Sequence, residues 1–594
     1  MSHGFWRKPS LVLGILVSLG LLTAVACGAA EEPTPTPPPA GPGATSTPTP
    51  PPAVATPTPT TTTAVVATPT ATAIPTPTPL PGIKPKRGGL VKQSAGEDPQ
   101  SFDGHTATSS AHNIHNQKLT SLLLWNSTGN EIVPDAAESY TISADGKVWT
   151  FKLRPNVKFQ TGYTPAHPRD GTAMNSKDVK WSLEKIMGLH GQTLSARSGW
   201  MKEFIDIDRA DNGIEVVDDL TFKIHLIQAF PGLASILAIG HSQLIPEGIV
   251  GTDLQKRPYG TGPFRLKSFQ RGALWQYARN PDYFKPGLPY LDQWDLVLMD
   301  GTAIIQAAFL TRKVDVSGGN PTADNKAIFD KRMASGEIYE LPDSSECRPQ
   351  AVNFNHTKPP FNDIKLRQAV NMGIDREAYK AVVHEGYAIP VLYLDTDGWG
   401  RSTAEIMKLP GHRTPHDADR AEAIRIIKEL YPSGLDVKMM ARNTSGYMRQ
   451  AEFIAGDLRK LGINVTVEPV DTSVAFGRAE KLDYTIWSYW FCQTTRTPDE
   501  LFGSYFITGG SRNWIGYSDP MVDKGYLDMA ATADPLEKRK KALALEDRIL
   551  AYLPSAPLAI HTSRLVVYSY VQDVPPGITQ YMRQKTELVW RSDI

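Results

Sequence analysis

The chain has 594 residues, and its 62 lysine and arginine residues balance its 62 aspartate and glutamate residues. A net charge of zero excludes the basic surface that nucleic-acid-binding proteins need, so we expect no nucleic-acid partner. Three cysteines are too few to hold a chain of this length together through disulfides, so its fold must depend on hydrophobic cores.

The first 26 residues are typical of an export signal. Arg7 and Lys8 precede 16 uncharged residues that end at Ala26, fewer than the roughly 20 that a membrane-spanning helix needs. The pattern therefore predicts a signal peptide over 1–26. Small residues precede Cys27, which is typical of a bacterial lipoprotein whose cysteine is lipidated after cleavage. The alternative is an ordinary Ala-x-Ala cleavage site beside an incidental cysteine.

The segment after Cys27 has a composition that cannot fold. Residues 31–81 contain 17 of the 48 prolines, and no charge lies between Glu32 and Lys84. With so little apolar surface and so many fixed φ angles, residues 27–84 are predicted to form a disordered, extended spacer. Thr/Pro-rich segments of this kind are also typical of O-glycosylated stalks.

The remainder of the chain carries the pattern of an α/β protein. Apolar and polar residues alternate over 435–439 and again over 463–467, as in half-buried strands. Between them, apolar residues recur at helical spacing over 454–461, before Gly462. This order of strand, helix and strand predicts a βαβ unit with a right-handed crossover.

Other local signals predict turns, caps and further elements. We expect strands over 149–153 and 221–226, a hairpin turn at Asp145-Gly146, a helix capped by Ser176 with Asp178, helices opened by Asp363 and Asp375 with Gly373 ending the first, and a helical stripe from Leu545 to Leu553.

Motifs for catalysis and cofactor binding are absent or incomplete. The chain has no Gly-x-Ser-x-Gly elbow, Walker loop or Cys-x-x-Cys pair, and Gly260-Thr261-Gly262-Pro263 lacks the third glycine of a dinucleotide fingerprint. His384-Glu385 lacks a second histidine because Ala388 stands there. Asp395 to Gly398 resembles a calcium loop, but Ile406 occupies the glutamate position, so we interpret it as a turn.

Histidines near residue 110 are the remaining metal-binding candidates. His112 and His115 could share one helical face, with His105 nearby in sequence, and neutral imidazoles in that arrangement can bind a transition metal. Partly exposed polar residues are the simpler interpretation, because Asn and Ser surround them. We therefore expect no catalytic residue, no metal and no cofactor.

A series of longer motifs resembles a known family. They are Ile132 to Ser139, Ser143 to Lys147, Thr150 to Arg154, Val157 to Phe159, Ser176 to Ser182, Gly260 to Phe264, Arg279 to Tyr283, Pro289 to Asp292, Pro360 to Asp363 and Ile374 to Arg376. In this order they resemble the extracellular solute-binding proteins of peptide/nickel-type ABC importers, family 5. The resemblance extends from about Gly88 to the C-terminus.

The resemblance implies an α/β fold with two lobes, the periplasmic-binding-protein fold of type II-like, large peptide-binder class, with an extra subdomain on lobe I. Transferred to this sequence, lobe I comprises 85–126, 259–345 and 556–594, the subdomain 127–258, and lobe II 346–555. The chain would cross between the lobes near 346–355 and 553–561, and the lobes would close on a ligand.

The implied function is that of a lipid-anchored, monomeric substrate-binding protein on the outer face of the cytoplasmic membrane. It would pass an oligopeptide or another small solute to an ABC permease driven by a separate ATPase, and it would touch the membrane only through its lipid. Two other classes stay open: a secreted cell-surface enzyme such as a hydrolase, and a ligand sensor for a signalling receptor.

The aromatic segment 487–491 is the candidate ligand site. Side chains of a strand alternate between its two faces, so these aromatics cannot all lie in one core. In peptide-binding relatives a tryptophan here lines the ligand site, which implies Trp490, beside Tyr489. Asn513 and Trp514, in an Asn-Trp-x-Gly-Tyr motif, are implied companions.

The resemblance also bears on ligand charge. Many peptide-binding relatives hold the peptide ammonium group with an aspartate a few residues after that tryptophan. Here the position falls on Gln493 or Thr494, neither acidic, and Arg496 adds a positive charge. A buried ammonium without a carboxylate is costly. The protein would therefore capture peptides by another group, or take a neutral or anionic ligand such as an oligosaccharide.

The last implied feature is a disulfide between Cys347 and Cys492. Some peptide-binding relatives carry a bridge between these two regions, and an exported protein works outside the reducing cytoplasm. The alternative is two separate buried thiols that behave as small apolar side chains.

Overall fold

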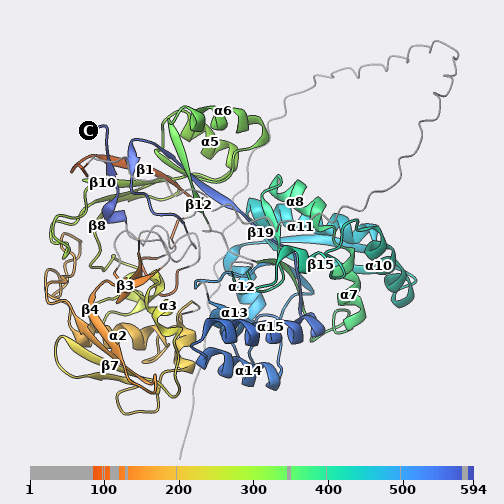
Figure 1. Ribbon diagram of the computed structural model, residues 1–594, viewed down its shortest axis with the longest axis horizontal. Coiled ribbons are helices and arrows are strands. Elements are labelled where there is room, and N and C mark those ends of the chain that lie inside the picture. Colours follow the sequence, from red (N-terminus) through yellow and green to blue (C-terminus); the bar gives the residue numbers. More distant parts are fainter. Residues whose placement is uncertain are drawn as a thin grey trace, which may run out of the picture. The chain divides into compact units, whose positions relative to one another are not determined.

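A computed structural model describes residues 84–96, 98–99, 101–107, 120–126, 131–195, 197–343, 349–395, 398–495, 497–577 and 586–594. The predicted signal peptide, Cys27 and nearly all of the spacer lie outside the described residues, as do His112, His115, Cys347 and Arg496. Within these ranges the chain is α/β, as predicted (Figure 1). No helix among the described residues is both long enough and apolar enough to cross a membrane.

A mixed sheet of seven strands is built from three separate parts of the sequence. Its order is β12 (Ile338–Asp343), β20 (Ser563–Tyr568), β11 (Val316–Gly318), β1 (Leu90–Ala95), β10 (Gln293–Leu298), β9 (Leu274–Arg279) and β8 (Phe264–Gln270). Helix α5 (Thr302–Leu310) packs on it through Phe309, whose ring stacks on Tyr568 with centroids 4.5 Å apart. Helix α6 (Ala323–Ala334) adds Phe329, which stacks on Phe309.

A second, antiparallel sheet has four strands. Its order is β4 (Ala137–Ile142), β5 (Val148–Leu153), β7 (Thr221–His225) and β6 (Ile214–Val216), with helix α2 (Ser176–Ile186) and the short helices η2 (Gly199–Glu203) and α3 (Leu233–Leu237) nearby in sequence. Both predicted strands and the hairpin turn are confirmed: Gly146 has φ +71°, and Ile142 pairs with Trp149.

The cap of α2 differs from the prediction. Asn175, rather than Ser176, caps the helix, because its side chain accepts hydrogen bonds from the backbone N–H groups of Lys177 and Asp178. Asp178 reciprocates through the Asn175 N–H at 2.8 Å, which completes a capping box. Ser176 is the first helical residue and is buried.

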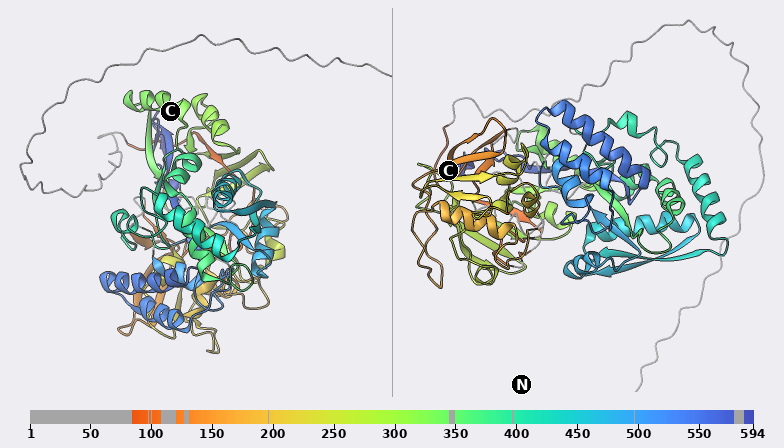
Figure 2. Two further views of the ribbon diagram at one scale, coloured as in Figure 1. Left: turned by 90° about the vertical axis from the view of Figure 1, so that its right-hand side faces the viewer. Right: turned by 90° about the horizontal axis from the view of Figure 1, so that it is seen from below.

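A third sheet has five strands. Its order is β16 (Ile463–Val470), β15 (Leu435–Arg442), β17 (Ile486–Trp490), β13 (Gln350–Phe354) and β18 (Ser555–Pro557). Its helices are α7 (Ile364–Gly373), α8 (Arg376–His384), α10 (Asp417–Leu430), α11 (Ser445–Lys460), α12 (Thr472–Glu480), α13 (Pro498–Tyr505), α14 (Pro520–Ala531) and α15 (Pro535–Tyr552). The first four share one hydrophobic core with the strands and the last four share another, and Figure 2 gives two further views of this region.

The predicted βαβ unit is present in this sheet. β15 and β16 are parallel, with Val437 opposite Val465, and α11 connects them. Gly462 follows the helix with φ +94°, a conformation that suits glycine. The predicted caps Asp363 and Asp375 also open α7 and α8.

Gly373 ends α7, as predicted, for a reason that the sequence did not show. A Cβ atom at this position would lie 2.1 Å from the Cδ1 of Leu461, which is buried. The glycine therefore allows α7 to pack closely against the end of α11, in place of the left-handed C-cap that we expected.

The chain passes twice between the seven-stranded and five-stranded sheets. One connection runs from β12 to β13, and the other runs from β18 through β19 (Ala559–His561) to β20. β19 pairs with β14 (Ala388–Pro390). The remaining short elements are β2 (Leu123–Trp125), β3 (Ile132–Pro134), η3 (Gly240–Ser242), α4 (Gly251–Leu254), α9 (Thr403–Ile406), β21 (Val571–Gln572), η4 (Thr586–Leu588) and β22 (Trp590–Arg591).

The largest hydrophobic core among the described residues joins the four-stranded sheet to helices α13, α14 and α15. It contains Trp149 and Phe222 from the strands and Tyr526 and Ala542 from α14 and α15. Phe204, just after η2, meets Tyr526 edge to face with ring centroids 6.0 Å apart. A smaller core lies within the seven-stranded sheet, and another within the five-stranded sheet.

Candidate functional site

Trp490 ends β17, and its side chain is half-buried, whereas the other four residues of the strand are buried. Its indole N–H donates a 2.6 Å hydrogen bond to Oε1 of Gln450. Its ring stacks on Tyr447, with centroids 4.3 Å apart and planes at 20°. The indole is thus held by its edge and by one face, a geometry suited to presenting a rigid aromatic surface.

Helix α11 supplies the residues that hold Trp490. Gln450 is fully buried, and its amide nitrogen donates to the backbone oxygens of Ala351, at 3.0 Å, and Tyr489, at 3.3 Å. This pair of bonds ties the helix to β13 and β17 and fixes the oxygen that receives the indole N–H. The guanidinium of Arg442 lies 4.4 Å from the ring centroid of Tyr447, which gives a stack of cation, phenol and indole.

Three of the residues proposed from the resemblance are tied into the protein interior. Tyr489 is 2% exposed, and its hydroxyl accepts a hydrogen bond from Nη2 of Arg512 at 3.2 Å. Trp514 lies in the same aromatic cluster, 5.9 Å from Trp487 between ring centroids. The Asn513 side chain bonds within its own loop, donating to the oxygen of Ile507 and accepting from the N–H of Tyr517.

The two positions considered for a peptide anchor differ in exposure. Gln493 is half-buried, whereas Thr494 is fully buried and its hydroxyl donates to Oε2 of Glu500 at 2.6 Å. Glu500 has no exposed surface. Burial raises its pKa, and the hydrogen bond from Thr494 and the charges of Arg197 and Arg512 oppose that rise. This carboxylate therefore faces the protein interior.

Two arginines that the sequence patterns did not single out converge behind the site. The backbone oxygen of Cys492 accepts hydrogen bonds from Nη1 of Arg197 and from Nη1 of Arg512, the latter at 2.9 Å. Arg512 adjoins the Asn-Trp motif and could have been noticed there. Arg197 comes from a loop nearly 300 positions earlier in the sequence, and no sequence pattern connects the two segments.

Cys492 is 3% exposed and is a disulfide-bonded cysteine. The identity of its partner stays a prediction, because Cys347 lies outside the described residues.

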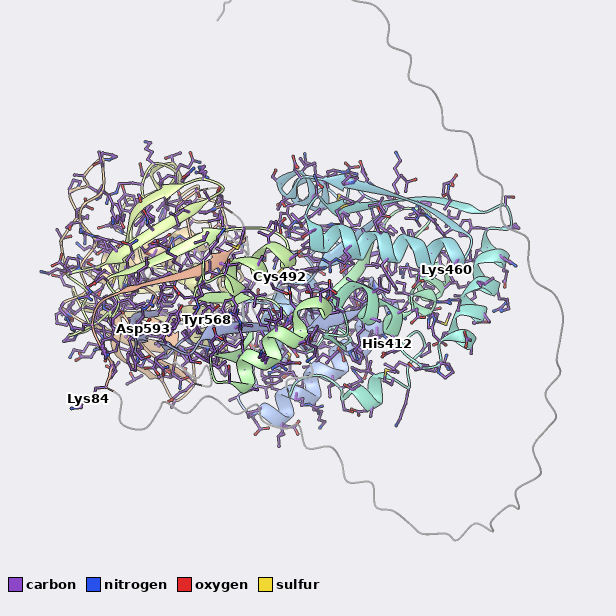
Figure 3. The ribbon with its side chains drawn as sticks, turned by 90° about the horizontal axis from the view of Figure 1, so that it is seen from above. Lys84, His412, Lys460, Cys492, Tyr568 and Asp593 are labelled. Atoms are coloured by element: carbon purple, nitrogen blue, oxygen red, sulfur yellow. The ribbon has the colours of Figure 1, made fainter. Side chains whose placement is uncertain are left out.

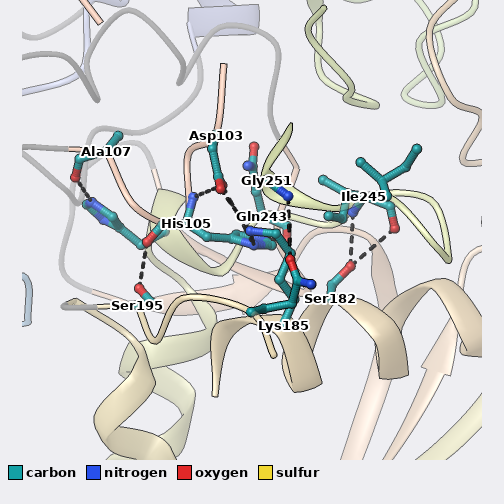
Figure 4. Close-up of polar contacts among 12 residues, drawn as sticks. Asp103, His105, Ala107, Ser182, Lys185, Ser195, Gln243, Ile245 and Gly251 are labelled. Carbon is teal, nitrogen blue, oxygen red and sulfur yellow. Dashed lines mark hydrogen bonds and ion pairs between the residues drawn. The ribbon is translucent and has the colours of Figure 1, made fainter. Parts of the chain in front are cut away.

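His105 is part of a buried polar cluster (Figure 4). Its Nε2 lies 2.9 Å from the backbone oxygen of Gln243, and its Nδ1 lies 3.3 Å from Nζ of Lys185. Lys185 also pairs with Asp103 at 2.8 Å. His105 is fully buried, so our interpretation of it as a partly exposed polar residue was wrong. Its ring contacts neighbouring protein groups at both nitrogens, which is a structural role.

One group of described residues has the spacing for a metal ion: Asp211, Glu215 and His225. Both carboxylates already have cationic partners, because Arg209 pairs with Asp211 and Lys223 pairs with Glu215, each at 3.0 Å. Lysine and arginine neighbours compete with a bound cation, so the group is better described as a surface ion-pair cluster.

Comparison with known proteins identifies the class. A family model described as bacterial extracellular solute-binding proteins, family 5, middle region, matches residues 131–513. The protein is thus an extracytoplasmic solute-binding protein. More specifically, the chain belongs to family 5, as its motifs predicted.

Individual relatives agree with this assignment. The glutathione-binding protein GsiB of Pectobacterium atrosepticum is 28% identical over 446 residues, which cover 72% of this chain and 80% of that protein. The dipeptide-binding protein of Pseudoalteromonas sp. SM9913, solved with Met-Leu, superposes with a TM-score of 0.73 and 21% identity over 85% of this chain and all of the other. AgaA of A. tumefaciens R10, solved with agropinic acid, superposes with a TM-score of 0.69 and is 24% identical in sequence. The superposition covers 82% of this chain and 96% of AgaA. These matches confirm the predicted two-lobed fold.

Proposed function

We propose that this protein is the lipid-anchored substrate-binding component of an ABC importer. It captures a small solute when its two lobes close and delivers the solute to a permease in the cytoplasmic membrane, which a separate ATPase drives. It works as a monomer, without a cofactor and without catalysis. Family membership supports the binding role, and the two connections between the sheets provide a route for hinge closure.

The observation that carries the binding site is the half-exposed indole of Trp490, held between Tyr447 and Gln450. A rigid aromatic surface of this kind binds ligands with little loss of side-chain entropy. Gln493, which is also half-buried and follows closely in sequence, is proposed as a polar contact. Tyr489, Thr494, Asn513 and Trp514 then contribute by holding the loops of the site in place.

The electrostatics favour a solute that needs no anchor for an ammonium group. The carboxylate nearest Thr494 belongs to Glu500, which is buried and bonded to Thr494 itself. Arg197 and Arg512 place positive charge directly behind the segment. A neutral or anionic solute avoids the cost of an uncompensated buried ammonium. Its chemistry could be that of a blocked or acidic peptide or of an oligosaccharide.

A thermal-shift and calorimetric screen tests both parts of this proposal. The panel contains glutathione, Met-Leu, N-acetyl-Met-Leu, agropinic acid and a set of oligosaccharides. A solute at 100 times its Kd adds about 2.7 kcal/mol to the free energy of unfolding, which is readily measured. We expect at least one neutral or anionic compound to bind, and acetylation of Met-Leu to leave binding unchanged or to improve it.

Two outcomes would contradict the proposal at different levels. Binding that requires a free amino terminus would overturn the ligand chemistry and leave the transport role intact. Turnover of a bound compound would overturn the binding-protein role itself. Small-angle scattering with the bound solute provides the control for mechanism, because hinge closure predicts a smaller radius of gyration.

A further inference from the structure

A cavity of about 160 Å³ lies in the region of the five-stranded sheet, apart from the Trp490 site. Figure 3 shows His412, which lines it, well separated from Cys492. The walls come from α8, β14, the loop 407–416 and the stretch between β18 and β19. Exposed Glu377, Arg413 and Thr414 mark the side on which the cavity reaches the surface.

Apolar atoms provide most of the cavity surface. The apolar residues that contribute to it are Ala388, Ile389, Pro390, Met407, Leu558 and Ala559, and the other lining residues are mainly polar or charged. Arg376 also lines the cavity, but the residue is 7% exposed and all three nitrogens of its guanidinium already donate to protein oxygens, among them those of Pro557 and Gly411. It therefore has no hydrogen bond to offer a ligand.

Two histidines also line the cavity, His412 and His416. The Nε2 of His416 lies 2.7 Å from the backbone oxygen of Met372 and its Nδ1 lies 4.0 Å from Asp375, so His412 is the histidine that we consider for a ligand. His412 is 5% exposed, and its Nδ1 has no hydrogen-bond partner among the described residues, although a buried polar atom is normally paired. Burial, followed by the charge of Arg376, holds its pKa well below 6.5, so the ring is neutral at pH 7. A neutral imidazole presents one donor and one acceptor nitrogen, which can bind a hydroxyl or an N–H group.

The charges at the rim do not favour an ionic ligand. Asp375 accepts a hydrogen bond from the N–H of Ala378 and pairs with Arg420, and Arg413 pairs with Asp419. Glu377 and Lys380, which also line the cavity, carry opposite charges. A ligand for this cavity is therefore uncharged, mainly apolar, and able to form one hydrogen bond.

From this geometry we propose that the cavity binds a small uncharged ring compound of the size of a phenol, with its polar group on His412. The volume supports the size, because an apolar cavity of about 150 Å³ holds benzene. The site goes beyond the proposed function, since its ligand need not be the transported solute. It touches Leu558 and Ala559, which lie on one of the two connections between the sheets.

Fluorine NMR titration with 4-fluorophenol and fluorobenzene tests the proposal without knowledge of the transported solute. We expect saturable binding of 4-fluorophenol with a Kd of about 1 mM, a reasonable affinity for so small a compound. Fluorobenzene should bind about fivefold more weakly, because it forms no hydrogen bond with His412. Failure of both compounds to bind at ten times that concentration would overturn the proposal.

Two variants and a matched control locate the site. Ala559→Leu fills the cavity and should abolish binding of both compounds, whereas Ala381→Leu, on the exposed side of α8 and outside the cavity, should change neither. His412→Leu should reduce 4-fluorophenol to the affinity of fluorobenzene. Circular dichroism checks that each variant is folded. If Ala559→Leu does not fold, His412→Leu serves as the test. Unchanged binding in a folded Ala559→Leu or His412→Leu variant contradicts the proposed site.

Discussion

The two tryptophans of β17 differ in the contacts of their side chains, and only one of them is placed to contact a solute. Trp487 and Trp490 lie three positions apart on β17, yet Trp487 is fully buried and Trp490 is not. The indole N–H of Trp487 has no hydrogen-bond partner among the described residues, whereas that of Trp490 bonds to Gln450. Only Trp490 is both fixed in orientation and accessible.

Replacement of Trp490 by alanine should weaken solute binding by about tenfold or more, because it removes a rigid aromatic contact surface. Trp487→Phe is the control: it removes buried volume and should lower the melting temperature while leaving affinity unchanged. Calorimetric titration with the solute found in the screen measures both variants. Wild-type affinity in Trp490→Ala would remove this residue from the site.

The buried pair of Asp103 and Lys185 predicts a dependence on pH. Burial raises the pKa of Asp103, but the charges of His105 and Lys185 and a hydrogen bond from Lys185 outweigh that effect, so the pKa lies below 3.8. Because folding favours the ionised form of this carboxyl group, the ionised group stabilises the folded protein. This stabilisation is complete above about pH 3.8 and is lost as the pH falls through the pKa of the folded state.

Asp103→Asn should therefore be less stable than the wild type at pH 6, and its melting temperature should fall less between pH 4 and pH 3. Thermal unfolding across pH 3–6 measures the two curves, and Asp282→Asn, at an exposed position, is the control for general acid effects. Parallel curves for wild type and Asp103→Asn would show that this pair is not a source of the acid sensitivity.

At the scale of secondary-structure elements, the effect of a glycine substitution in a helix depends on how tightly the glycine is packed, and not on helix propensity alone. Glycine is unfavourable within a helix, yet Gly373 lies at the point where α7 meets Leu461 and Gly456 lies within α11 with no atom near its Cβ position. The same substitution should thus have opposite effects in two neighbouring helices.

Gly373→Ala should destabilise the protein by about 1–3 kcal/mol, because the new methyl group overlaps Leu461 in a packed core. Gly456→Ala should stabilise it by about 0.5–1 kcal/mol through helix propensity alone. Chemical denaturation of the two single variants measures the difference. Equal stabilities would mean that Leu461 moves aside without cost.

The predicted disulfide would join the connection before β13 to the segment after β17. Such a bridge closes a loop of about 145 residues, for which the chain-entropy model gives on the order of 5 kcal/mol as an upper value. In the mature protein, with Cys27 lipidated, we expect no reactive thiol under denaturing, unreduced conditions and two after reduction. Two reactive thiols before reduction would rule out the bridge between Cys347 and Cys492.

For the molecule as a whole, the proposed lipid anchor at Cys27 would determine where the binding lobes work. The spacer separates Cys27 from the first strand, β1, by more than 60 residues of sequence. A lipid on Cys27 would then tether the lobes while leaving them free to reach a permease.

Cys27→Ala should prevent lipidation and release the protein from the membrane. Detergent phase partition measures this: the wild type should enter the detergent phase and the variant the aqueous phase, with equal solute affinity in both. Metabolic labelling with a fatty acid provides a second readout. A wild-type protein that stays aqueous and unlabelled would favour the ordinary cleavage site.

The sequence by itself determined the class of fold and the family. Alternation over 435–439 and 463–467, the helical pattern between them, and the caps Asp363 and Asp375 depend on neighbours within a few residues, so they can be recognised locally. The motifs and their order along the chain are sufficient to indicate family 5, and the family match agrees.

Tertiary structure decided what depends on residues distant in sequence. Arg197 reaches Cys492, Gln450 fixes Trp490, and Leu461 explains Gly373, each across an interval that no local pattern spans. The cavity beside His412 likewise combines α8, β14 and residues 558–559. Hydrogen bonds and packing act over a few ångströms in space, so only the folded chain shows which of its residues they connect.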